Sequence, residues 1–149
     1  MQKFGLKGDN GFVVIEIIEV YGFPDDTTHL GGYDCRCSIN LENEGFKVND
    51  EFYSSTGQMY ELMLSLKKLY KDLSGKIIFS NTYEDNLMLE ISMDSSYGRI
   101  SIKGEYFRLS ENEISMNFEI NSDQSYIPST INELESIYEI YGGLTGIKN

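Results

Sequence analysis

The 149-residue sequence has no tryptophan and only two prolines, and it contains no low-complexity tract or Gly/Ser-rich linker. In the absence of such a boundary, residues 1–149 are predicted to form one domain, with residues 142–149 either a flexible tail or docked on the body. No stretch approaches the roughly 18 apolar residues of a membrane span, and the N-terminus has no apolar signal-peptide core. We therefore expect a cytoplasmic protein.

Cysteine and histidine are also scarce. Cys35 and Cys37 fall two apart on one predicted strand and point the same way, near the distance limit for an unstrained disulfide. They are predicted to be buried thiols in a reducing compartment. A catalytic Cys37–His29 pair is disfavoured, because an apolar setting raises a thiol pKa. Two Cys and one His fall short of the roughly four ligands of a zinc site, so no metal and no cofactor are predicted. His29 is expected to be a solvated loop residue.

Positive charge is the scarcest property. Twelve Lys and Arg face 24 Asp and Glu, which gives a net charge of −12, and no base occurs between Lys7 and Arg36 or between Arg108 and Lys148. This balance opposes direct nucleic-acid binding and favours a basic protein partner. Ordinary acidic solubility explains the same charge, so the charge alone leaves both interpretations open.

Alternating apolar and polar residues predict several antiparallel strands with one wet face. The apolar members of four such strands are Tyr33/Cys35/Cys37/Ile39/Leu41, Leu87/Leu89/Ile91/Met93, Ile100/Ile102/Tyr106 and Ile114/Met116/Phe118/Ile120. A further strand over residues 12–21 slips in phase between Glu16 and Glu19, which indicates a bulge or burial on both faces.

Two segments change to helical spacing. The first has apolar positions from Met59 to Leu73, with Ser55 and Gln58 as a capping box and Gly75 as its stop. The second places Ile127, Ile131, Leu134, Tyr138 and Tyr141 on one stripe, with Pro128 in its first turn and Gly142 just past its end. The predicted fold is α+β: a single, mostly antiparallel β-sheet of about seven to eight strands with two helices packed on one face.

The search for catalytic motifs finds no phosphate loop, nucleophile elbow, metalloprotease pair or calcium loop. Acidic pairs occur at Asp25/Asp26, Glu42/Glu44, Asp50/Glu51 and Glu84/Asp85, all predicted to lie in loops or turns. These pairs are candidate partner contacts rather than catalytic groups, so no catalytic residue is predicted. Six aromatic residues are candidate anchors beside them: Tyr21, Phe23, Tyr53, Tyr83, Tyr97 and Phe107. Tyr83 and Tyr97 complete the set of predicted partner-binding residues.

Three stretches resemble the WapI family of bacterial immunity proteins, which are encoded beside contact-dependent or cell-wall-associated toxins. They are residues 33–39 (YDCRCSI) with 45–48 (GFKV), residues 66–75 (LKKLYKDLSG) with 76–79 (KIIF), and residues 117–120 (NFEI) with 123–128 (DQSYIP). The opening residues 4–8 (FGLKG) fit as well, so the resemblance covers most of the chain. Tyr33 stands where the family pattern suggests Trp, and the loop 22–32 looks specific to this chain.

The resemblance implies a non-enzymatic protein that binds and blocks a cognate toxin domain, often a nuclease with a basic cleft. We therefore expect an acidic immunity protein, a monomer or weak homodimer, that captures its toxin by complementary charge. One alternative is an adaptor or structural subunit that binds a host protein through the open sheet. A second is a small hydrolase with paired carboxylates, which requires a deep pocket and a raised carboxyl pKa.

Overall fold

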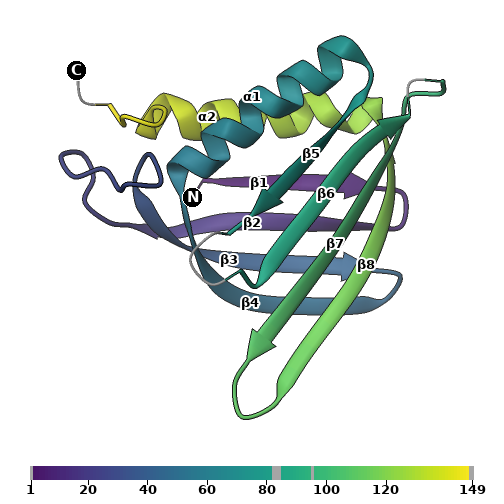
Figure 1. Cartoon of the computed structure of the whole chain (residues 1–149), viewed down its shortest axis with the longest axis horizontal. Helices are drawn as coiled ribbons and strands as arrows, with labels where there is room; N and C mark the ends of the chain where they lie inside the picture. Colours follow the sequence, from purple (N-terminus) through teal and green to yellow (C-terminus); the bar gives the residue numbers. More distant parts are fainter. Residues whose placement is uncertain (1, 82–84, 95, 148–149) are drawn as a thin grey trace.

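The computed structural model describes residues 2–81, 85–94 and 96–147, the side chain of Leu109 excepted. Eight strands form two antiparallel sheets, each a simple meander of four (Figure 1). The first sheet contains β1 (Lys3–Gly8), β2 (Gly11–Val20), β3 (Asp34–Asn43) and β4 (Phe46–Ser55). The second contains β5 (Gly75–Ser80), β6 (Leu87–Asp94), β7 (Arg99–Leu109) and β8 (Glu113–Asp123). The α+β class and the strand number are confirmed, but the prediction of a single sheet is wrong.

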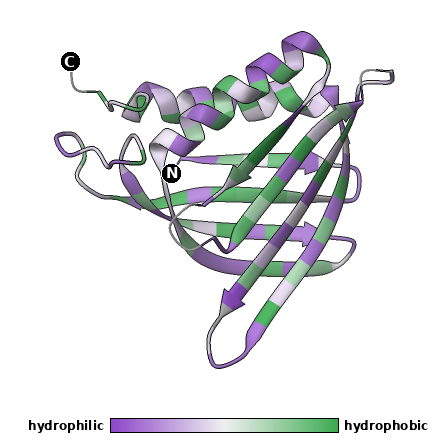
Figure 2. Ribbon diagram, in the orientation of Figure 1, coloured by the Kyte–Doolittle hydropathy of each residue, from purple (hydrophilic) through white to green (hydrophobic). Residues whose placement is uncertain are grey.

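The core lies between the two sheets. The strands of one sheet cross those of the other steeply, and hydrophobic and hydrophilic residues alternate along most strands (Figures 1 and 2). Inward residues such as Ile15 and Ile39 of the first sheet and Leu89 and Ile91 of the second are almost fully buried. Alternation at period two gives each sheet one apolar face, and two such faces bury each other in a sandwich. Strand alternation therefore predicts the inner residues correctly without saying which strands share a sheet.

The two helices close the gap between the sheets. Helix α1 (Thr56–Asp72) packs along β5 and helix α2 (Ile127–Tyr141) packs along β1, and the two helices contact each other. A single-turn 3-10 helix, η1 (Gln124–Tyr126), leads from β8 into α2. The predicted packing of both helices on one sheet face is therefore wrong, since they lie along the edge strands and contribute to the core from the open side.

The α2 helix also covers the outer edge of β1. Thr130 Oγ1 donates to the Gly5 carbonyl at 2.6 Å, and the Gly5 N–H donates to Glu133 Oε1 at 3.1 Å. An edge strand with free backbone groups is prone to pair with other chains, so these bonds protect the first sheet on that side.

Local sequence signals are largely confirmed. The register of β2 against β3 shifts between Ile17 and Glu19, which is the predicted bulge. Ser55 accepts a hydrogen bond from the Gln58 N–H at 3.2 Å and so caps α1 as expected, but the Gln58 side chain bonds Ser54 and the Ser80 carbonyl and does not complete the predicted capping box. The helix ends earlier than predicted, because Leu73 adopts the left-handed conformation and Gly75 already belongs to β5.

Most side-chain predictions are confirmed, but Tyr70, Leu73, Ile114 and Tyr138 are exposed although their patterns placed them on apolar faces. Cys35 and Cys37 are buried free thiols, and contact with the Cys37 thiol, followed by burial, raises the pKa of Cys35. His29 is exposed as expected. On α2, Ile137 is buried where the stripe predicted Tyr138, whose exposed ring stacks on Tyr60.

The loop between β2 and β3 packs against the segment that follows α2. The Gly32 N–H donates to the Leu144 carbonyl at 2.8 Å, and the Ile147 N–H donates to the Tyr33 hydroxyl at 3.1 Å. Tyr33 in turn donates to the Pro24 carbonyl at 2.8 Å. Residues 143–147 are thereby docked on the body of the protein.

Candidate partner-binding surface

The predicted contact residues lie in four separate regions. Asp25 and Asp26 are exposed in the loop between β2 and β3, and Glu44 lies in the turn between β3 and β4. Tyr97 lies in the turn between β6 and β7, where its ring contacts the Arg99 guanidinium at 5.2 Å. The fourth region contains Asp50, Glu51 and Asp85, and the predicted residues Tyr83 and Glu84 fall outside the described residues.

The expectation that all the acidic pairs lie in loops is wrong for two of them. Asp50 and Glu51 belong to β4, and Glu42 belongs to β3. Because neighbours on a strand point to opposite faces, Asp50 and Glu51 do not act as a pair. Glu51 accepts a hydrogen bond of 2.7 Å from Arg36 Nη1 on the outer face of the first sheet. This bond is the main reason that the pKa of Arg36 is raised.

Asp50 faces the second sheet through a polar network. Its Oδ2 accepts a hydrogen bond of 2.6 Å from the Tyr106 hydroxyl, and its Oδ1 lies 3.6 Å from Arg108 Nη1. Asn86 Nδ2 donates to the same hydroxyl at 3.2 Å, and Asn81 donates to Asn86 Oδ1. The Asp50 side chain keeps 17% exposure and lines an open hollow of about 730 Å³ beside Arg108. The network fixes one corner where the two sheets meet.

A two-stranded ribbon leaves the body at this corner. β6 pairs with β7 only as far as Leu87 opposite Tyr106, whereas β7 and β8 stay paired to Leu109 opposite Glu113. The hairpin therefore projects beyond the second sheet (Figure 1). Ile114 on the ribbon is 65% exposed although it has the inward phase of β8, because the first sheet does not reach it.

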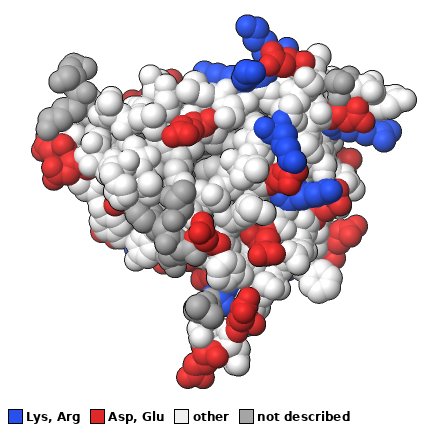
Figure 3. Space-filling view, in the orientation of Figure 1, with Lys and Arg blue, Asp and Glu red and all other residues white. Residues whose placement is uncertain are grey.

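Acidic side chains gather around this ribbon. We define the acidic corner as Asp50, Glu51, Asp85, Glu105, Glu111 and Glu113, with Arg108 as the base bonded among them. The projecting lower part of the molecule in Figure 3 shows mainly acidic side chains, whereas basic ones gather at the upper right, over the end of α1 and β5. Of these residues, Glu105, Glu111 and Glu113 are not among those predicted from the sequence.

A signal for the ribbon is present in the sequence. The inward phase of β7 runs Ile100, Ile102, Gly104 and Tyr106, and it then places Arg108 at the next inward position. A base on the apolar phase marks the point where a strand leaves the core. The length of β8 alone does not reveal the projection, since its partner strands are unknown at that stage.

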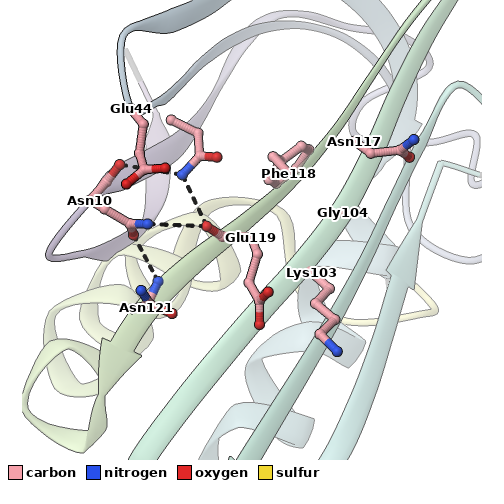
Figure 4. A pocket seen from close by; sticks show the side chains of 9 residues that line it. Asn10, Glu44, Lys103, Gly104, Asn117, Phe118, Glu119 and Asn121 are labelled. Carbon is pink, nitrogen blue, oxygen red and sulfur yellow. Dashed lines mark hydrogen bonds between the residues drawn. The ribbon is translucent and has the colours of Figure 1, made fainter.

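A second hollow, of about 610 Å³, has a structural role (Figure 4). Asn10 and Asn43 donate through their Nδ2 atoms to the Glu119 carbonyl, at 3.3 and 3.0 Å, and Asn10 Oδ1 accepts from the Asn121 N–H at 2.8 Å. Glu44 lines the same hollow. Because its amides are used in fastening the turns of the first sheet to β8, the hollow is part of the framework.

A family model decides the relationship of this chain to known proteins. The model described as the Immunity protein WapI-like family matches residues 4–142. This chain belongs to that family. No curated protein matches the chain. Family membership confirms the resemblance of the three sequence stretches and implies that the chain neutralises a cognate toxin.

The WapI-like family is non-enzymatic, and the described residues give the hydrolase alternative no support. The two carboxyl groups there with a displaced pKa are Glu90, lowered by Lys76, and Asp123, lowered by Ser125. A carboxyl group that acts as a general acid needs a raised pKa, and both of these values are lowered. No group of three or more metal-ligating side chains occurs in the described part, and none of its helices is long and apolar enough to cross a membrane.

Proposed function

We propose that this WapI-like protein neutralises its toxin by direct capture in the cytoplasm, that the acidic corner forms the contact, and that the toxin is a basic nuclease. The observation that carries the proposal is the projecting ribbon. It combines Glu111 and Glu113 with the exposed Ile114, and Asp50 lies at its base. An interface needs apolar area as well as charge, and Ile114 supplies exposed apolar surface on the face of the ribbon opposite Glu113.

Charge complementarity supports a nuclease as the target. A nuclease binds phosphate through Lys and Arg, so its active cleft is basic and attracts an acidic surface. Opposite fields raise the association rate, which suits a protein that must capture its toxin before damage occurs. The basic side chains at α1 and β5 lie away from the ribbon, so they do not cancel its field (Figure 3).

The remaining predicted residues take a secondary place in the proposal. Glu44 lies beside amides that fasten the sheets together, and Asp25 and Asp26 lie in the loop that the residues after α2 hold in place. Tyr97 is at the far end of β7 from the ribbon. A toxin that covers the acidic corner need not reach these residues.

The test is binding and protection. The probe is the C-terminal domain of the large secreted protein encoded beside this chain, in a catalytically inactivated form for binding and in its active form for growth. We expect a stable complex with nanomolar affinity and restored growth when both are expressed in one cell. A toxin domain from an unrelated locus is the matched control and is expected neither to bind nor to be neutralised.

A second assay tests the toxin class. A nuclease target predicts that the purified toxin domain degrades DNA or RNA and that this chain stops degradation at about equal molar amounts. Binding without any nuclease activity would leave the capture function standing and remove the nuclease. Absence of both binding and protection would remove the whole proposal and favour the adaptor alternative.

A further inference from the structure

The outer edge of β8 is covered along only half of its length. At the covered end, the Asp9 N–H donates to the Asn121 carbonyl at 2.8 Å, and the Asn121 N–H donates to Asn10 Oδ1 at 2.8 Å. The Glu119 carbonyl accepts from Asn43 at 3.0 Å. The turns of the first sheet therefore satisfy the edge at residues 119 and 121.

These contacts fix the direction of every backbone group on the strand. The N–H and C=O of one residue in an antiparallel strand point the same way, and successive residues alternate. Residues 119 and 121 point away from β7, so Glu113, Ser115 and Asn117 do as well. The pairing of β7 with β8 has no register shift that would break this rule. Within the described residues, no hydrogen bond to the outward backbone groups of Ser115 or Asn117 is found.

The free half of the edge has little of the usual protection against pairing, since Glu113 is its one charged side chain. Proteins guard such edges with Lys, Pro, bulges or a covering element. The segment from Glu113 to Asn117 has no Lys or Pro, and it stands on the projecting ribbon (Figure 1). By contrast, α2 covers β1, and Gln58 of α1 donates to the Ser80 carbonyl of β5 at 2.8 Å. The free end of β4 carries Lys47.

We infer that a basic strand of the toxin domain adds to the second sheet by pairing with β8 along residues 113–117. This inference rests on the proposed function and specifies how the acidic corner holds its partner. Backbone hydrogen bonds to Ser115 and Asn117 would supply the docking, and Glu113 would face Lys or Arg on the added strand. A second copy of this chain would instead place two acidic ribbons together at a net charge of −12 per chain, which opposes association.

The deciding variant is Ser115→Pro. Proline removes the outward N–H and places its ring on the edge, but it breaks no bond to β7 because that N–H points away. The inactivated toxin domain is expected to bind about tenfold more weakly, which corresponds to the loss of one backbone hydrogen bond. Ser115→Ala keeps the backbone and should bind within about threefold of the unmodified protein.

Asn49→Pro is the matched control on the other open edge. The Tyr53 carbonyl of β4 points outward to Asn81, so the Asn49 N–H, four positions away along the same strand, is also outward. We expect this variant to bind like the unmodified protein. Weaker binding by Asn49→Pro together with normal binding by Ser115→Pro would place the partner on β4 and overturn the inference.

Amide hydrogen exchange tests the same contact without a substitution. In the free protein, Ser115 and Asn117 should exchange fast, whereas Ile114 and Met116, which bond to β7, should be protected. Adding the toxin domain should protect Ser115 and Asn117 as well. If toxin binding leaves both amides fast, the inference fails and the proposed function stands. If the unmodified protein neither binds nor protects, both fail. If Ser115→Pro converts a dimer of this chain into monomers, the occupant is a second copy and the inference also fails.

Discussion

Tyr106 and Asp50 join the two sheets through one hydrogen bond of 2.6 Å between residues 56 positions apart in the chain. The tyrosine belongs to β7 and is almost fully buried, and the aspartate belongs to β4. The same hydroxyl accepts from Asn86, so one oxygen satisfies groups from both sheets. The corner from which the ribbon projects is therefore held by polar contacts as well as by packing.

Replacing Tyr106 with Phe should destabilise the protein by about 1–3 kcal/mol, because the Asn86 amide and the Asp50 carboxylate lose a buried partner. For a domain of this size, at about 2–4 °C per kcal/mol, that corresponds to a fall in melting temperature of roughly 2–12 °C, measurable by calorimetry. Tyr126→Phe is the control, since its hydroxyl bonds to Asp9 at 3.0 Å on the exposed surface. Tyr126→Phe should lower the free energy of unfolding by less than about 0.5 kcal/mol. Equal losses for the two variants would show that the corner network adds no net stability.

Reversing two charges of the acidic corner, in Glu105→Lys/Glu111→Lys, should slow toxin association about tenfold at low salt and flatten its salt dependence. The control is Asp25→Lys/Asp26→Lys, which changes the net charge equally in the loop after β2. Stopped-flow measurement at several salt concentrations separates the local field from the total charge. Equal slowing by both variants would assign the effect to net charge alone.

Asp123→Asn should change the acid sensitivity of folding. The pKa of Asp123 is lowered, first by the Ser125 hydroxyl and then by the Ser125 N–H, which donates at 2.8 Å. A lowered folded pKa adds stability above the unfolded value, about 3.9 for Asp, and this stability is lost as the pH falls through the folded value. The variant should therefore have a lower free energy of unfolding than the unmodified protein near neutral pH. This difference should become smaller below about pH 4. Urea unfolding at several pH values measures this difference in stability. When Ser125 is also replaced by Ala, the effect of Asp123→Asn should depend less on pH.

Gly104→Ala should destabilise the second sheet by about 1–3 kcal/mol through overpacking. An added Cβ would overlap Phe118 Cζ and lie 2.8 Å from Leu89 Cδ2, both in the core. Shortening the facing ring, in Gly104→Ala/Phe118→Leu, should recover part of the loss. A double-mutant cycle by urea unfolding gives the coupling, and strictly additive costs would contradict the proposed clash.

The sequence predicts the inner face of each strand because burial follows alternation, as at Ile39 and Leu89. It does not predict two sheets, since alternation is the same whether strands share a sheet or face one another across a core. Helix ends follow caps where a side chain makes the cap, as at Ser55, and fail where the backbone ends the helix by itself, as at Leu73.

The candidate surface is harder to predict for a similar reason. Asp50 and Glu51 look like one acidic pair in the sequence, yet the pleat of β4 sends them to opposite faces. Nothing in the sequence pairs Asp50 with Tyr106, because the contact depends on how the second sheet crosses the first. The ribbon is the reason to consider Glu105, Glu111 and Glu113 as contact residues. Its projection depends on where β6 ends, which the sequence does not show.

The bonds from α2 to Gly5 have a consequence for the order of folding. Thr130 and Glu133 reach back over 125 and 128 positions to one residue of the first strand. A growing chain that has not yet exposed α2 holds the first sheet with an open edge, and contacts of such long range form slowly. The folded protein therefore forms only after synthesis of the whole chain, because α2 is the last helix to be made. The edge of β1 is therefore closed only after the last helix has been made and has docked on it.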